Sequence, residues 1–237
     1  EIGYPSVLTA PTWGFYDVAF KGKNFKLSQD YGSYVMENIL FKISFPAEFH
    51  SQTAAEAAVK LHPIVKDRLS DIKSIKIKTH ESAIRIISKV GPLNNPADRD
   101  HCLQYMIAVP LAFGNLTAEH YEDEFHRSNP IIDALREKMT VEEEPRYTTE
   151  YLESEKRSIA NSLQIFFNDG SVTDEIEINY PVGHRRRREE GIPLLEEKFM
   201  TNLLTVFTRD RCNAIYDLCK DQEKLENTRV NEFIDLF

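Results

Sequence analysis

The chain has 237 residues, of which 41% are hydrophobic and 28% are charged, and its formal net charge at pH 7 is −9. This composition is typical of a globular protein with one large domain or two small ones. The acidic balance excludes a general nucleic-acid binder, because such a surface repels phosphate. No apolar run approaches the roughly 18 residues that a membrane span needs, so we expect neither nucleic acid nor a membrane as a partner.

The cysteines indicate free thiols rather than a metal site. Cys102, Cys212 and Cys219 form no CxxC pair and no Cys/His spacing typical of zinc or an iron–sulfur cluster. We therefore expect a reducing compartment and no cofactor.

The first 35 residues are rich in aromatic residues, glycine and proline but show little periodicity. We expect a packed loop with short helical turns, built around the aromatic residues Trp13, Phe15, Tyr16, Phe20, Tyr31 and Tyr34. Because the sequence starts at Glu1 rather than at a methionine, we also expect a segment upstream to have been removed.

Lys42 is the single cation within an apolar run that comprises Ile39, Leu40, Phe41, Ile43 and Phe45. One interpretation is that its stem lies on a strand edge while the ammonium reaches water. The other is that the ammonium points into a partly dry cleft, where it is held for an anionic ligand.

His50 lies directly before a predicted helix. Residues 51–53 offer capping oxygens, and Thr53–Leu61 has a helical pattern that Pro63 is expected to disturb rather than continue. The backbone donors and the dipole of a helix N-terminus both favour a carboxylate, so His50 marks a candidate anion site.

Three segments predict a small antiparallel sheet. Residues 72–78 alternate loosely between isoleucine and polar residues, as a strand does. Two further strand-like runs, 157–167 and 171–180, flank Asn168-Asp169-Gly170, a short turn that predicts a β-hairpin.

The remaining periodic segments predict helices. Asp98 is a candidate N-cap for a buried helix over Cys102–Phe113, kinked near Pro110 and ended by Gly114. After Tyr180 the pattern is only helical, with predicted helices at 192–207, 209–220 and 230–237. The fold class is therefore α+β, with a domain boundary near Tyr180.

Three stretches carry a resemblance to a known family: Lys42-Ile-Ser-Phe-Pro-Ala-Glu-Phe-His50, residues 95–105 and residues 183–195. Over nearly its whole length the chain resembles the C-terminal half of the MmgE/PrpD family. That resemblance implies an all-helical domain into which an α+β lid is inserted. On this plan residues 1–38 are a helical-domain remnant and linker, 39–181 form the lid, and 182–237 are C-terminal helices of the helical domain. The partners implied are the missing N-terminal helical domain and a second copy in a homodimer.

The resemblance also implies an activity, the elimination of water from the tricarboxylate 2-methylcitrate to give 2-methyl-cis-aconitate in propionate breakdown. The reaction would proceed without the iron–sulfur cluster of aconitases. The compartment would be the bacterial cytoplasm or the mitochondrial matrix.

Residue by residue, the resemblance assigns pocket roles to Lys42 and Tyr105, and a weaker match assigns one to His50. These three are the candidate catalytic residues. Tyr105 has an alternative interpretation as a core tyrosine whose hydroxyl is bonded locally. Arg185 and Arg186, within the run 185–188, are candidate substrate-binding residues that would clamp a carboxylate, although such a run is also typical of a solvated face or of ties to acidic neighbours.

Two functions remain open. The chain is either the lid and C-terminal helices of a hydro-lyase, inactive alone because other acid/base groups lie outside it, or a partner-binding or regulatory module. In the second case the arginine run and the acidic segment 118–125 would be the partner surfaces.

Overall fold

The structure, a computed structural model, describes residues 6–23 and 37–237. The chain forms two compact units, Glu1–Ile39 and Leu40–Phe237. The first unit contains the short helix α1 (Phe15–Phe20), which ends where Lys21 adopts a left-handed conformation with φ of 52°. This helix agrees with the predicted short turn, whereas Tyr31 and Tyr34 lie outside the described residues.

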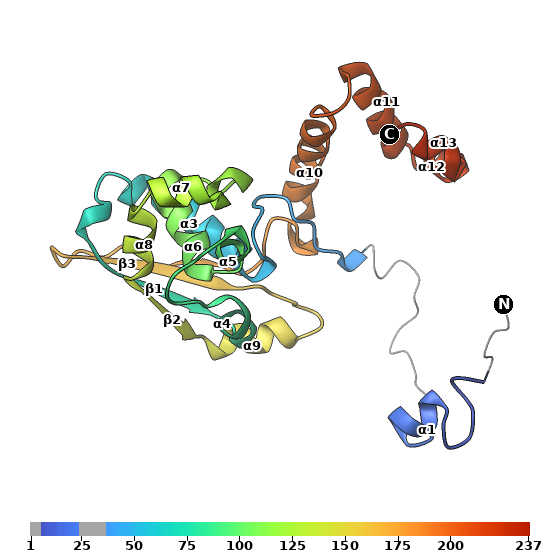
Figure 1. The fold of residues 1–237 in the computed structure, drawn as a ribbon, viewed down its shortest axis with the longest axis horizontal. Coiled ribbons are helices and arrows are strands. Elements are labelled where there is room, and N and C mark those ends of the chain that lie inside the picture. The colour runs from blue at the N-terminus through green and yellow to red at the C-terminus, as the bar shows by residue number, and fades with distance from the viewer. Residues whose placement is uncertain (1–5, 24–36) are drawn as a thin grey trace. The chain divides into compact units, whose positions relative to one another are not determined.

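The second unit mixes helices with one sheet, so the predicted α+β class is confirmed (Figure 1). Its strands are β1 (Ile72–Thr79), β2 (Met139–Glu143), β3 (Asn161–Phe167) and β4 (Ile176–Ile178). Its 3-10 helices are η1 (Phe49–Ser51), η2 (Leu69–Asp71), η3 (Ala118–Tyr121) and η4 (Arg185–Arg187). Its α-helices are α3 (Gln52–Val65), α4 (Glu81–Ile87), α5 (Pro96–Asp100), α6 (Leu103–Phe113), α7 (Asp123–Ser128), α8 (Ile131–Arg136), α9 (Pro145–Leu152), α10 (Arg188–Leu203), α11 (Arg209–Lys220), α12 (Gln222–Asn227) and α13 (Val230–Ile234).

The predicted hairpin is confirmed. β3 and β4 pair antiparallel, and the turn between them includes Gly170 with φ of 85°. The backbone N–H of Phe167 donates to the carbonyl of Ser171 over 2.9 Å. The predicted strand at 72–78 is β1, and it lies antiparallel to β3 in the same sheet.

The sheet is nevertheless mixed, and in this respect the predicted antiparallel sheet is wrong. The strand order is β2-β1-β3-β4, and β2 runs parallel to β1. A parallel neighbour requires a long crossover, which the helices from α4 to α8 supply. β2 has no fully buried residue and carries glutamates, so its sequence lacks the apolar alternation that predicts a strand.

Two helices form the centre of the core. α3 packs on β3 and β4, and α6 packs on α3 (Figure 1). The face of α3 is made of small buried residues, among them Ala54, Ala55, Ala57 and Ala58, which allow the two helices to approach closely. α6 is buried from Leu103 to Leu111. It continues through Pro110 and ends at Gly114 with φ of 79°, as predicted.

Two local predictions are wrong. α3 continues through Pro63 to Val65, because a proline in the last turn costs only one backbone bond of a helix that packing already fixes. Asp98 is not an N-cap. It lies inside α5, where its backbone N–H donates to the side chain of the true cap, Asn95, over 2.9 Å.

The C-terminal helices have their own apolar cluster, formed by buried Leu203, Cys212 and Ile215. α10 begins at Arg188 and ends at Leu203, so it starts and ends four residues before the predicted helix. α11 has the predicted bounds. Helices are the only regular elements after Tyr180 in the residues described there.

Candidate functional site

A polar cluster forms where η1 meets the C-terminal end of β1 and the last turn of α9. It contains Glu48, His50, His80 and Tyr151. His80 directly follows β1, and Tyr151 lies 101 residues from His50 in sequence. The fold therefore assembles three elements around the predicted residue His50.

Glu48 binds His50 through both carboxylate oxygens. Nδ1 of His50 lies 2.8 Å from Oε1 and 2.9 Å from Oε2, and the backbone N–H of His50 donates to Oε2 over 2.8 Å. Burial raises the pKa of Glu48, but the hydrogen bonds and charge of His50 outweigh it, so the pKa is lowered overall. The side chains are only 12% (His50) and 16% (Glu48) exposed, so solvent screens this pair weakly.

His80 is fully buried beside His50. Its ring lies 5.0 Å from the ring of His50 and is stacked on Tyr151 at 4.5 Å. Nε2 of His80 has no hydrogen-bond partner among the described residues. Burial, helped by the charge of His50, lowers the pKa of His80 to about 4. His80 is therefore uncharged at neutral pH.

The sheet fixes the backbone of His50. The side-chain amide of Asn161, the first residue of β3, donates to the carbonyl of His50 over 2.8 Å and to Oγ1 of Thr53 over 2.7 Å. The Thr53 hydroxyl donates in turn to the carbonyl of Ile159. The first turn of α3 is thus tied to the start of β3 by the protein's own groups.

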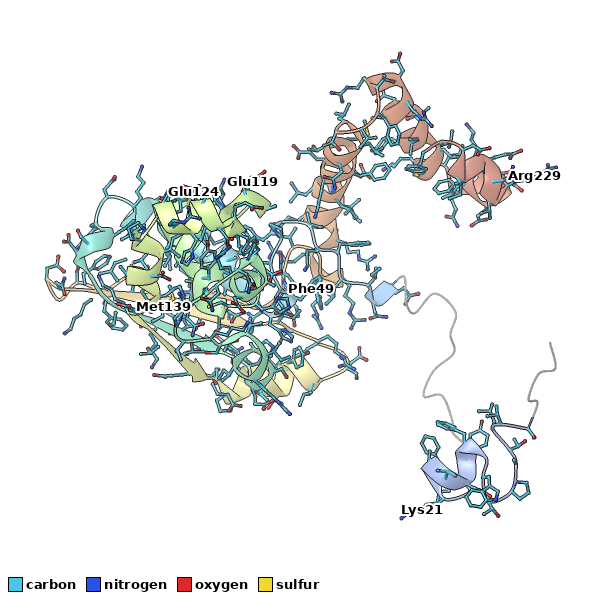
Figure 2. All side chains as sticks on the ribbon, viewed as in Figure 1. Lys21, Phe49, Glu119, Glu124, Met139 and Arg229 are labelled. Carbon is cyan, nitrogen blue, oxygen red and sulfur yellow. The ribbon has the colours of Figure 1, made fainter. Side chains whose placement is uncertain are left out.

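Lys42 is exposed and does not lie in a strand. Its Nζ lies 5.3 Å from the centroid of the Phe49 ring, a cation–π distance, and Phe49 is labelled in Figure 2. The carbonyl of Lys42 accepts a hydrogen bond from Lys198 in α10. The strand-edge interpretation of Lys42 is wrong about the strand. Its expectation that the ammonium reaches water agrees with the structure.

Tyr105 is fully buried in α6. Its hydroxyl donates to the carbonyl of His120 over 2.6 Å, and its ring lies 5.9 Å from Tyr121 and 5.5 Å from His126. Burial raises the pKa of Tyr105 well above its usual range, so the group is a hydroxyl donor at neutral pH. This placement agrees with the interpretation as a core tyrosine.

A charged network adjoins Tyr105. Arg99 is buried and donates from Nε to the carbonyl of Tyr121 over 2.7 Å, while its Nη2 pairs with Asp123. His126 lies 3.0 Å from a carboxylate oxygen of Asp133. These side chains line a cavity of about 460 Å³ that also includes Leu93, Asn94, Arg127 and Pro130.

The arginine run is tied to neighbouring groups. Arg185 and Arg186 each donate from Nη2 to the carbonyl of Glu155, over 2.8 and 2.9 Å. Arg187 pairs with Glu56 over 2.7 Å and with Glu190 over 2.7 Å. The interpretation as ties to acidic neighbours is therefore correct for Arg187.

The predicted catalytic residues have different neighbours. Lys42 contacts Phe49, His50 contacts Glu48 and Tyr151, and Tyr105 contacts His120. In the part of the chain that the structure describes, no hydrogen bond or ring contact links any two of these three side chains. Their roles in catalysis stay predictions.

The comparison with known proteins decides the family. The model of the MmgE/PrpD C-terminal domain matches residues 45–222, well over half of the chain. The chain belongs to this family. It is 56% identical to the 2-methylcitrate dehydratase of Cupriavidus necator and 55% identical to that of Salmonella typhimurium, each over 240 residues. It is also 55% identical to the mitochondrial 2-methylcitrate dehydratase of Yarrowia lipolytica.

These alignments cover 100% of the chain but 49%, 50% and 46% of the three relatives. The MmgE/PrpD chain thus spans about half the length of the curated relatives it matches. Among the helices that the structure describes, none combines the length and the apolar character needed to cross a membrane.

Reasoning from the sequence found only His50 of the polar cluster in this MmgE/PrpD domain. The sequence does contain a signal for Glu48, because a carboxylate two residues before a histidine can reach the histidine ring. His80 and Tyr151 gave no such signal, since each reaches His50 through the pairing of strands and the path of α9.

Proposed function

We propose that the protein containing this chain dehydrates 2-methylcitrate to 2-methyl-cis-aconitate, in propionate breakdown. The observation that carries the proposal is the 54–56% identity, over the full chain, to bacterial relatives named 2-methylcitrate dehydratase.

The chain brings suitable groups to this reaction. Elimination of water requires a base for a carbon-bound proton and an acid for the departing hydroxide. The Glu48–His50 pair has the chemistry of a base. Tyr105 is our candidate for the acid, and it can act only when its hydroxyl is released from the His120 carbonyl. A tricarboxylate also needs cations, and we assign that role to Lys42, with Arg185 and Arg186 as further candidates.

We propose that residues outside this chain complete the site. The relatives are about twice as long, and the Tyr105 hydroxyl is committed to the His120 carbonyl. We therefore propose an N-terminal helical domain as the partner, a homodimer as the assembly, and little turnover by the chain alone. The compartment proposed is the bacterial cytoplasm or the mitochondrial matrix, since relatives of both kinds match.

The test is an assay of the natural full-length protein with 2-methylcitrate, followed by ultraviolet absorbance of the unsaturated product. Citrate serves as the comparison substrate, and the 237-residue chain alone as a second sample. We expect dehydration by the full-length protein and at least about 100-fold less by the chain. Absence of dehydration by the full-length protein contradicts the proposal.

A further inference from the structure

The ring of His50 has a defined proton position. A carboxylate can only accept hydrogen bonds, and Nδ1 of His50 lies within 2.9 Å of both Glu48 oxygens. The pKa of Glu48 is lowered by its bonds to His50, so the carboxylate is ionised at neutral pH. Nδ1 therefore carries a proton in either charge state of the ring, and whenever the ring is uncharged Nε2 holds the lone pair.

Tyr151 faces that lone pair. Its hydroxyl lies 3.3 Å from Nε2 of His50, which is long for a hydrogen bond from a hydroxyl. The Tyr151 ring is stacked at 4.5 Å on His80, which is fully buried and uncharged. The hydroxyl is thus held by a rigid neighbour, while its own bond to Nε2 is weak enough for another proton donor to replace it.

We propose that Glu48 and Tyr151 are positioning residues for His50 in the dehydration reaction. Glu48 fixes the tautomer in which Nε2 carries the lone pair. The Tyr151 hydroxyl orients the ring through its contact with Nε2 and occupies the position that the substrate proton would take. This inference rests on the proposed function and deepens it, because it identifies the atom that receives the proton.

The first test is the tautomer of His50 in the full-length protein labelled with ¹⁵N-histidine. In the uncharged state of the ring, reached by raising the pH, the wild type should show a pyrrole-like Nδ1 and a pyridine-like Nε2 for His50. Glu48→Ala should change this to a mixture of tautomers. The matched control is Asp100→Ala, since Asp100 contacts His101 over 2.6 Å in an exposed pair. It should leave the His50 signals unchanged.

The second test is kinetic. Glu48→Ala should lower kcat about 100-fold or more, with KM changed less than about threefold, because a wrong tautomer removes the base and not the binding site. Tyr151→Phe keeps the ring on His80 and removes only the hydroxyl. It should keep the Nδ1-protonated tautomer and lower kcat about tenfold.

Failure of this inference is distinct from failure of the proposed function. If wild-type protein does not dehydrate 2-methylcitrate, the proposed function fails, and the tautomer measurement alone decides whether Glu48 positions the ring. If wild type is active, an unchanged kcat in both variants overturns the inference. If Glu48→Ala does not fold, the kcat of Tyr151→Phe and the tautomer of wild-type His50 decide. A neutral wild-type ring that is protonated at Nε2 instead of Nδ1 overturns the inference.

Discussion

The carbonyl oxygen of Phe41 lies 1.7 Å from the point that a β-carbon on Gly183 would occupy. The backbone N–H of Phe41 also donates to the carbonyl of Gly183 over 3.1 Å. The segment that precedes η1 and the segment that precedes α10 therefore lie backbone against backbone. Only glycine leaves room for this contact.

Gly183→Ala should destabilise the protein by about 1–3 kcal/mol, because an added methyl group must push the Phe41 backbone away. Urea unfolding measures the change. The control is Gly170→Asn, where φ is 85° and nothing lies within 4 Å of an added β-carbon. Asparagine tolerates this conformation, so the control should cost about 1 kcal/mol or less. Equal stability of Gly183→Ala and wild type would show that the two segments are not in contact.

Stability should fall as the pH is lowered from about 6.5 to 5. Burial lowers the pKa values of His80 and His184 to about 4, with help from the charges of His50 and of Arg185, respectively. Their pKa values are about 6.5 in the unfolded chain. Between these pH values the two histidines bind protons in the unfolded state but not in the folded state, so a lower pH favours unfolding. The loss should be about 2 kcal/mol per histidine at pH 5.

The measurement is urea unfolding at several pH values between 5 and 8. His80→Phe keeps a ring against Tyr151 and removes the titrating group. It should show a shallower fall in the free energy of unfolding than wild type. The same slope in both proteins would mean that His80 is not held uncharged.

The sequence predicted those parts of the fold whose signals are local. The hairpin around Gly170 and the helix ended by Gly114 follow from a turn residue next to an apolar run. β2 was missed because it has no fully buried residue. The sequence predicts that Pro63 disturbs the helix. It does not, because packing of the whole α3 face outweighs one lost hydrogen bond.

The candidate site could be predicted only in part. The sequence predicts His50, but Tyr151 reaches it across 101 residues and His80 across a strand end. Such neighbours depend on strand order and helix direction, and β2, which sets the path into α9, carried no readable signal. For Lys42 the sequence left two interpretations open, an ammonium in water and an ammonium in a partly dry cleft. Its exposed position belongs to an irregular segment that periodicity does not describe.

Tyr105→Phe should destabilise the protein by about 1–2 kcal/mol, because the buried carbonyl of His120 loses its hydroxyl donor. The measurement is again urea unfolding. Tyr216→Phe is the matched control, since its hydroxyl binds Glu196 over 2.7 Å at the surface, and it should change stability by less than about 0.5 kcal/mol. If both variants are as stable as wild type, the Tyr105 hydroxyl is free for catalysis rather than bound in the core.

Lys42→Met in the full-length protein separates a binding role from a structural one. The side chain is exposed and its ammonium lies over Phe49, so its loss should change the free energy of unfolding by less than about 1 kcal/mol. If the ammonium meets a substrate carboxylate, losing that charge-assisted bond costs roughly 2–4 kcal/mol of transition-state stabilisation. Lys198→Met, which removes the neighbouring ammonium of α10, is the control.

The most direct measurement is therefore kcat/KM for 2-methylcitrate dehydration by full-length wild type and Lys42→Met. We predict measurable dehydration by wild type and a decrease of about 30- to 1000-fold in the variant, at unchanged stability. No dehydration by wild type would contradict the dehydratase, and the same kcat/KM in both proteins would contradict a site that includes Lys42.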